Sequence, residues 1–120
     1  MTRLFSLGLL ILLVVTPARA AEELTGTWRQ ATEESGVSYW ELTPKGEHTY
    51  EAQEYGLGGA KGTARLEDGR LVIRFETADG GKGYYEWHLK GRMGKGKLVY
   101  TPAGGERKVY DNSSARFIGK

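Results

Sequence analysis

Histidine, serine and carboxylate side chains supply most acid–base and nucleophilic chemistry in proteins, and this chain spaces them poorly for that purpose. Its only two histidines, His48 and His88, fall on opposite faces of their predicted strands, whereas a metal site needs three or more converging ligands. Glu86-x-His88 and Glu41 offer acid–base groups, but nothing beside them positions a substrate. No nucleophile-elbow motif surrounds the serines that follow the first twenty residues, Ser35, Ser38, Ser113 and Ser114. We therefore predict no catalytic residue, no metal site and no cofactor.

The glycine-rich segment 91–97 matches a phosphate-binding loop only in part. Its letters GRMGKGK fit the spacing up to the last position, where Leu98 replaces the Ser or Thr that holds magnesium. The segment is also expected between two strands rather than between a strand and a helix. We interpret it as a basic hairpin turn, with an anionic partner at this rim as the alternative.

The first twenty residues have the parts of a secretory signal peptide. A positive start precedes an apolar run over residues 4–15, and Ala18-Arg19-Ala20 places small residues where signal peptidase reads them. The apolar run spans twelve positions, whereas a membrane-spanning helix needs about 20. We predict a signal peptide over residues 1–20, cleaved after Ala20, and a periplasmic or secreted domain over residues 21–120 without a membrane anchor.

Removal of this leader makes the domain electrically neutral. Arg3 and Arg19 leave with it, so 15 basic and 15 acidic residues remain and the formal net charge falls from +2 to zero. A neutral domain gives no electrostatic reason to expect nucleic acid as a partner. The chain has no Cys, which excludes disulfides and thiolate chemistry. So small a domain then has to rely on a continuous hydrophobic core and a closed sheet.

Glycine clusters divide the rest of the chain into short β-prone runs. The centres of these runs lie mostly nine to fourteen residues apart, the interval typical of an all-β sandwich or barrel. Asp68-Gly69 is the clearest hairpin signal, because both residues adopt positive φ at little cost. The predicted strands are residues 24–30, 38–43, 48–54, 62–67, 70–77, 84–90, 97–101 and 107–111.

Alternation within these runs indicates one apolar and one polar face. Leu71, Ile73 and Phe75 share one parity and are opposed by Val72 and Arg74. About eight short strands joined by tight turns most simply form an antiparallel up-and-down β-barrel, because closing the sheet removes its exposed edges. We therefore predict an all-β, single-domain barrel, with a two-sheet β-sandwich as the alternative.

The same alternation sorts the many aromatic residues. Tyr39, Tyr84 and Tyr110 have outward parity and are candidates for an external binding surface. About half of the aromatic residues suffice to fill the core of so small a domain, so the surplus is available to line a ligand cavity. The candidate ligand-binding residues of the barrel interior are Trp28, Trp40, Tyr50, Phe75, Trp87 and Tyr100.

Leu24-Thr25-Gly26-Thr27-Trp28 is the most specific string after the leader. It resembles the opening strand of lipocalins and related calycins, where Gly-x-Trp places a Trp across one end of an eight-stranded barrel. The resemblance implies a barrel fold, a small ligand inside it, and an Arg near the C-terminus packed on the Trp, here Arg107 or Arg116. Avidins open similarly, but the residues that contact biotin after the Trp are absent, so biotin binding is not implied. The alternative is that Gly26 and Trp28 only close the barrel.

Charge divides the chain into two halves. Residues 22–54 have a local net charge of −6, and residues 55–120 have one of +6. Closing a barrel brings the first strand against a late one, so we expect the two halves to complement each other along a seam. If they are separated in space, a basic binding surface is favoured instead.

Two hypotheses for function follow. The first is non-enzymatic binding of a small apolar or amphipathic ligand inside the barrel, argued by analogy from the fold. The alternative is a protein-binding module, such as an inhibitor of an exported enzyme, that uses loop tips and external tyrosines. The barrel interior distinguishes them: aromatic rings that meet at the axis leave no room for a ligand, whereas an open, lined cavity disfavours the second hypothesis.

Overall fold

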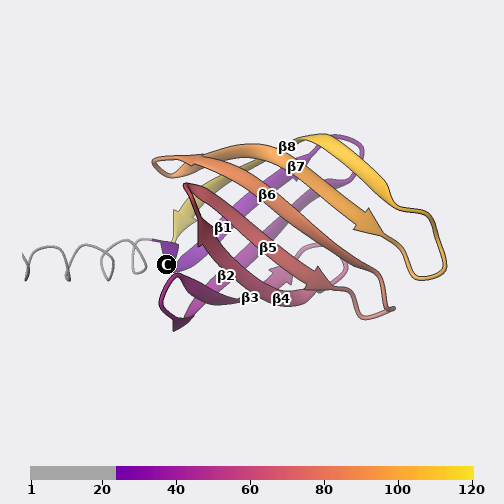
Figure 1. Cartoon of the computed structure of the whole chain (residues 1–120), viewed down its shortest axis with the longest axis horizontal. Helices are drawn as coiled ribbons and strands as arrows, with labels where there is room; N and C mark the ends of the chain where they lie inside the picture. Colours follow the sequence, from indigo (N-terminus) through magenta and orange to yellow (C-terminus); the bar gives the residue numbers. More distant parts are fainter. Residues whose placement is uncertain (1–23) are drawn as a thin grey trace, which may run out of the picture.

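The computed structural model describes residues 24–120, so the predicted signal peptide over residues 1–20 lies outside the described part. The described chain is one all-β domain whose eight antiparallel strands close into a barrel (Figure 1). The strands are β1 (Gly26–Thr32), β2 (Gly36–Gly46), β3 (Thr49–Tyr55), β4 (Lys61–Glu67), β5 (Arg70–Glu76), β6 (Lys82–Lys90), β7 (Met93–Thr101) and β8 (Lys108–Gly119).

The connectivity is up-and-down throughout. Each strand pairs with the next one along the chain, and β8 returns to pair with β1, which closes the barrel. Closure leaves no strand with an unpaired edge. The predicted barrel is confirmed, and the two-sheet sandwich is wrong. No helix among residues 24–120 is long and apolar enough to cross a membrane.

The two ends of the barrel differ in their connections. Turns of two residues join β2 to β3, β4 to β5 and β6 to β7 at the short-turn end, where β8 also ends. Longer connections over residues 33–35, 56–60, 77–81 and 102–107 lie at the opposite, long-loop end (Figure 1). At the short-turn end, Asp68 and Gly69 have φ values of 50° and 76°, which confirms the hairpin predicted there.

The end of the chain differs most from the predicted strands. Met93–Gly96 belongs to β7 instead of a loop, because its glycines serve close packing rather than turning. A Cβ on Gly96 would lie 1.7 Å from the backbone oxygen of Glu86, and one on Gly94 would lie 2.9 Å from Cβ of Trp87. The last strand is also longer than the predicted 107–111, because it continues through Asn112-Ser113-Ser114 to Gly119.

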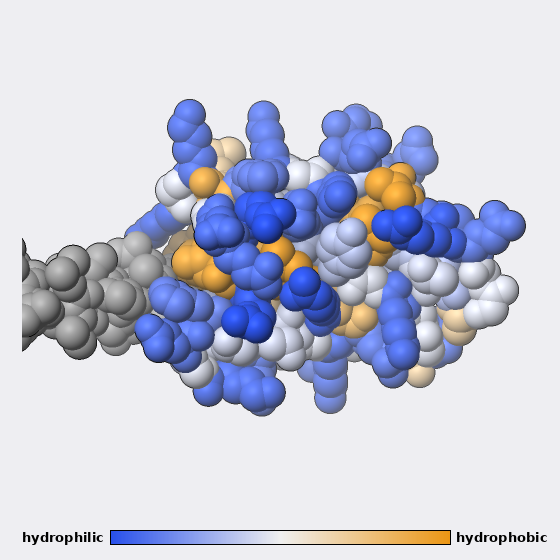
Figure 2. All heavy atoms as spheres, in the orientation of Figure 1, coloured by the Kyte–Doolittle hydropathy of each residue, from blue (hydrophilic) through white to orange (hydrophobic). Residues whose placement is uncertain are grey.

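The hydrophobic core fills the inside of the barrel, as alternation predicted. Leu42, Leu71 and Ile73 are at most 1% exposed, as are all three tryptophans, Trp28, Trp40 and Trp87. At the short-turn end, the indole N–H of Trp28 donates to the backbone oxygen of Leu24 at 3.0 Å. Outside, one face carries mainly hydrophilic side chains with separate hydrophobic patches between them (Figure 2).

Candidate functional site

The six candidate ligand-binding residues all belong to the barrel interior. Trp28, Trp40, Tyr50, Phe75 and Trp87 are buried, and Tyr100 is half-buried and packs against the same core. Burial raises the pKa of Tyr50 to about 12. Parity alone therefore placed these residues correctly, while their role as ligand contacts stays a prediction.

The interior rings lie against one another. The ring centroid of Phe75 is 5.6 Å from that of Trp40, 5.5 Å from that of Tyr85 and 6.1 Å from that of Tyr100. Tyr85 also stands 4.9 Å from Trp87. These are contact distances for aromatic rings. Protein side chains thus fill the middle of the barrel, and the hollows described below open on its outer wall.

A chain of hydrogen bonds runs around the inside near the long-loop end. The indole N–H of Trp87 donates to Ser113 Oγ at 2.8 Å, and the Ser113 and Thr32 hydroxyls bond at 2.8 Å. Thr32 Oγ1 then donates to Gln30 Oε1 at 2.7 Å. Gln30 Nε2 donates to Ser38 Oγ at 2.9 Å, and Ser38 donates to Glu54 at 2.9 Å. This hydrogen-bond chain was not predicted, because its only sequence signal is polar residues at inward parity.

Glu54 is the last acceptor in this chain of hydrogen bonds. Its side chain is 6% exposed and makes no ion pair with any described residue. Besides Ser38, the backbone N–H of Ala60 donates to Glu54 Oε1 at 3.3 Å. Burial, and then the charge of Glu54, raises the pKa of Tyr85, while contacts with Trp40 and Ser38 lower it to a smaller extent. The Trp40 indole N–H is fully buried, and its approach to Tyr85 falls short of a hydrogen bond.

The Trp at the barrel end is covered differently from the lipocalin expectation. Phe117 packs edge-on against Trp28, with ring centroids 5.5 Å apart, and the guanidinium of Arg92 lies 5.2 Å from the Phe117 centroid. Neither Arg107 nor Arg116 stacks on Trp28. A Phe near the C-terminus therefore takes the place expected for Arg.

The other chemical candidates stay apart. His48 has φ of 57° in the turn between β2 and β3, while His88 is exposed on β6. Among residues 24–120, no three His, Asp or Glu side chains are grouped to hold a metal ion. In the phosphate-loop-like segment, Gly91 and Arg92 form the predicted hairpin turn between β6 and β7, while Lys95 and Lys97 belong to β7.

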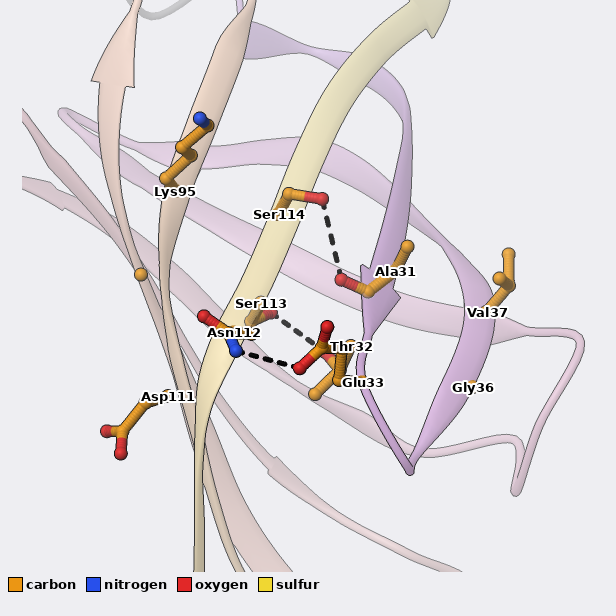
Figure 3. Close-up of a pocket in the computed structure, with 11 residues that line it drawn as sticks. Ala31, Thr32, Glu33, Gly36, Val37, Lys95, Asp111, Asn112, Ser113 and Ser114 are labelled. Atoms are coloured by element: carbon orange, nitrogen blue, oxygen red, sulfur yellow. Dashed lines mark hydrogen bonds between the residues drawn. The ribbon is translucent and has the colours of Figure 1, made fainter.

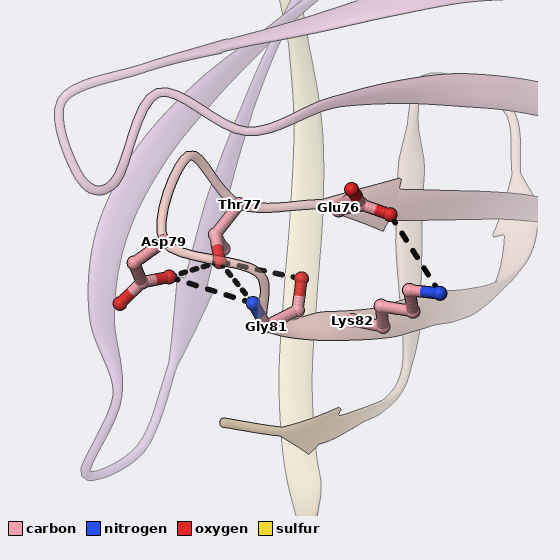
Figure 4. A network of polar contacts seen from close by, with 5 residues as sticks. All are labelled: Glu76, Thr77, Asp79, Gly81 and Lys82. Atoms are coloured by element: carbon pink, nitrogen blue, oxygen red, sulfur yellow. Dashed lines mark hydrogen bonds and ion pairs between the residues drawn. The ribbon is translucent and has the colours of Figure 1, made fainter. Parts of the chain in front are cut away.

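A polar turn closes one side of the long-loop end. Thr77 Oγ1 donates to Asp79 Oδ1 and accepts from the backbone N–H of Gly81 at 2.8 Å (Figure 4). The hydrogen bond from Thr77 lowers the pKa of the Asp79 carboxyl below its usual 3.8, and the hydrogen bond from the Gly81 backbone lowers it further, by a smaller amount. Lys82 and Glu76 form an ion pair at 3.8 Å at the base of the turn. These contacts account for the turn without a ligand.

A row of six outward side chains crosses six neighbouring strands, from the long-loop end at β3 to the short-turn end at β6 and β7, and we call it the aromatic–basic band. Strand register aligns each member with the next, and none of the six is acidic. Tyr39 is 37% exposed, Tyr55 53% and Met93 57%. From β3 to β6, by way of β2, β1, β8 and β7, the band consists of Tyr55, Tyr39, Arg29, Arg116, Met93 and Lys90.

One hollow lies along this band, and a second adjoins the first. One of about 650 Å³ is bordered by Arg29, Arg116, Met93, Lys90 and Lys95, and no acidic residue lines it. The other, of about 750 Å³, adjoins it across Ser114 and Lys95 and extends to Val37. In Figure 3, β8 crosses this second hollow between Lys95 of β7 and Ala31 of β1. Carboxylates of Glu33 and Asp111 also border it.

The outward tyrosines are only partly as predicted. Tyr39 is exposed and Tyr84 half-buried on the outer wall. Tyr110 instead packs against the core, because the register of β7 and β8 shifts between Gly96 and Leu98 and reverses the faces that follow. A bulge of this kind is not visible in the alternation of a single strand.

No ion pair joins the two oppositely charged halves in the described chain. Arg70–Glu86, Arg74–Glu67 and Lys82–Glu76 lie within residues 55–120, and Glu47–His48 within residues 22–54. The closing seam instead has a hydrogen bond from Asn112 Nδ2 to Glu33 at 2.7 Å. The three cations of the band, Arg29, Arg116 and Lys90, take part in none of these ion pairs, so no ion pair compensates the charge of the band. No protein-family model and no curated protein matches this chain.

Proposed function

We propose that this protein is an exported, non-enzymatic β-barrel that binds a protein partner through the aromatic–basic band. The observation on which the proposal chiefly rests is the composition of that row: two tyrosines, two arginines, a Met and a Lys, with no acidic residue. Aromatic residues, Met and Arg are enriched in protein interfaces, and Tyr and Arg are common among the residues that dominate binding energy.

The neighbouring surface extends this band. Val37 and Leu57, 39% and 46% exposed, lie beside the two tyrosines at the start of β2 and in the connection after β3. The rings packed inside the barrel support the same proposal, because they leave the outer wall as the surface with accessible hollows. The predicted leader adds the proposal that the partner is met in the periplasm or outside the cell.

Affinity purification tests the proposal. The full-length chain, tagged after Lys120 and produced in its own host, is compared with a Tyr39→Ala/Tyr55→Ala variant and with Tyr84→Ala as a matched control on the far wall. We expect a partner chain to co-purify with the parent and the control and to be lost from the double variant. A partner retained by the double variant, or no partner with any protein, rejects the proposal.

A second function, binding of a small amphipathic ligand, is favoured by one specific observation. The buried carboxylate of Glu54 has no cation and the Trp40 indole N–H has no acceptor, and burying such groups is costly. To complete both, a ligand that enters at the long-loop end would have to displace packed side chains, because both groups are buried and no described hollow reaches them. Ligand binding of this kind would agree with the resemblance to lipocalins in Gly26-x-Trp28 and in the eight-stranded barrel.

Native mass spectrometry of the protein from its own host tests this second function. We expect a retained small molecule on the parent and on Glu51→Gln, which changes an outward carboxylate of the same strand, but not on Glu54→Gln. A bare mass for the parent protein rejects it.

A further inference from the structure

Arg29 and Arg116 form an uncompensated pair of cations at the seam of the barrel. They lie directly opposite each other on β1 and β8, and both side chains are on the outer wall. Like charges placed directly opposite each other on a sheet repel. Two arginines at the strand pair that closes the fold therefore need a reason beyond stability.

No acidic side chain relieves this pair. The register neighbours of Arg29 and Arg116 outside the pair are Tyr39 and Met93, and neither arginine forms an ion pair within the described chain. The nearest acid along β2, Glu41, lies two residues beyond Tyr39 on the same face and makes no ion pair either. Both guanidinium groups thus retain their donors for another molecule.

The space beside the pair has the size and lining of a binding site. The hollow of about 650 Å³ borders both arginines, and Lys90, Lys95 and His88 line the same hollow. Leu89 and Met93 add apolar surface to it, and no carboxylate lines it. The lining therefore matches an anion that carries apolar groups.

We propose that the Arg29–Arg116 pair binds a carboxylate of an acidic segment in a protein partner. Arginine holds carboxylates with two parallel hydrogen bonds, which gives orientation as well as attraction. The exposed rings of Tyr39 and Tyr55 continue the same row of register neighbours toward the long-loop end. They offer apolar contacts to the side chains beside the acid, as a protein segment would use and a simple inorganic anion would not. This inference rests on the proposed partner binding and names the chemistry of the partner.

Charge reversal at the pair tests the inference. Arg29→Glu/Arg116→Glu is compared with Lys61→Glu/Arg65→Glu, a control that makes the same change in net charge on β4 at two exposed cations without ion pairs. In the co-purification experiment, we expect the partner to be lost from the first variant only. A synthetic peptide of alternating Glu and Phe should bind the parent and the control at least about tenfold more tightly than it binds Arg29→Glu/Arg116→Glu. Its affinity should fall as salt is raised.

The outcomes separate this inference from the proposed function. If the partner is lost with Tyr39→Ala/Tyr55→Ala but kept by the charge-reversed pair, partner binding stands and the acidic segment is rejected. If heparin or phosphatidylserine vesicles bind the parent and not the reversed pair while the acidic peptide binds neither, a protein segment is the wrong occupant. If the parent itself dimerises and the reversed pair does not, a second copy of this chain is the occupant and the inference is again overturned. Circular dichroism of both variants checks that each is folded.

Discussion

Ser113 on β8 accepts a hydrogen bond of 2.8 Å from the indole N–H of Trp87 on β6, although β7 lies between these two strands. Gly96 of β7 pairs with both residues by register. Because glycine has no side chain, the indole passes over the β7 backbone to reach Ser113. One glycine thus allows the internal hydrogen-bond chain to continue from Trp87 toward Glu54.

Removing the Ser113 hydroxyl should destabilise the barrel. Ser113→Ala leaves the Trp87 indole N–H without its acceptor and the Thr32 hydroxyl without one partner, both in the interior. A buried donor that loses its partner costs about 1–3 kcal/mol. We expect a loss of this size in the free energy of unfolding measured by urea titration. Ser114→Ala, on the outer face of the same strand, is the control, and equal stability of the two variants would contradict the prediction.

Adding a methyl group at position 96 should be still more damaging. In Gly96→Ala the new Cβ would lie 1.7 Å from the backbone oxygen of Glu86, so β6 and β7 have to separate locally. Overpacking against backbone costs about 1–3 kcal/mol or more. Thermal unfolding should show a clear drop in Tm. Gly46→Ala is the matched control, because no atom lies within 4 Å of the Cβ built there. If Gly96→Ala and Gly46→Ala have the same Tm, the prediction is wrong.

The strand count and the inward face followed from the sequence because both depend on local patterns, and closure followed from the need to remove exposed edges. Leu71, Ile73 and Trp87 were placed correctly by parity alone, since a period of two residues is set by the pleat of a single strand. Gly94 and Gly96 were not, because glycine serves both turning and close packing. Only the neighbouring strand, which carries Trp87, decides which of these roles applies.

The candidate site was less predictable because register creates it. Arg29 and Arg116 are far apart in the sequence and meet only when β8 closes on β1. Tyr110 was assigned to the wrong face because β8 has one extra residue between Tyr110 and Ser113, which shifts the pairing. Outward parity pointed to Tyr39, whereas Arg116 lies beyond the last predicted strand and was considered only as a cover for Trp28. Their alignment in one row, however, is a property of the closed sheet.

Relieving the repulsion at the seam should stabilise the fold. Arg116→Gln removes one of two like charges that face each other across β1 and β8, and such pairs cost on the order of 0.2–1 kcal/mol. We expect a small rise in Tm at low ionic strength that shrinks as salt screens the charges. Arg65→Gln, an exposed cation on β4, should leave Tm nearly unchanged. A fall in Tm for Arg116→Gln would mean that the pair is compensated within the molecule.

Tyr50 should make the barrel sensitive to alkali. Burial raises the pKa of Tyr50 from 10.0 to about 12. Below pH 10 the phenol is neutral in the folded and unfolded chains. Between pH 10 and pH 12 the unfolded chain releases this proton while the folded barrel keeps it, so the free energy of unfolding falls as pH rises, by at most about 3 kcal/mol.

Tyr50→Phe cannot ionise, so it should lose less stability than the parent in urea titrations between pH 10 and pH 12. Tyr85, whose pKa is also raised, keeps some alkaline sensitivity in that variant. Tyr55→Phe removes an exposed phenol and should follow the parent curve. Parallel curves for the parent and Tyr50→Phe would show that this phenol ionises equally in both states.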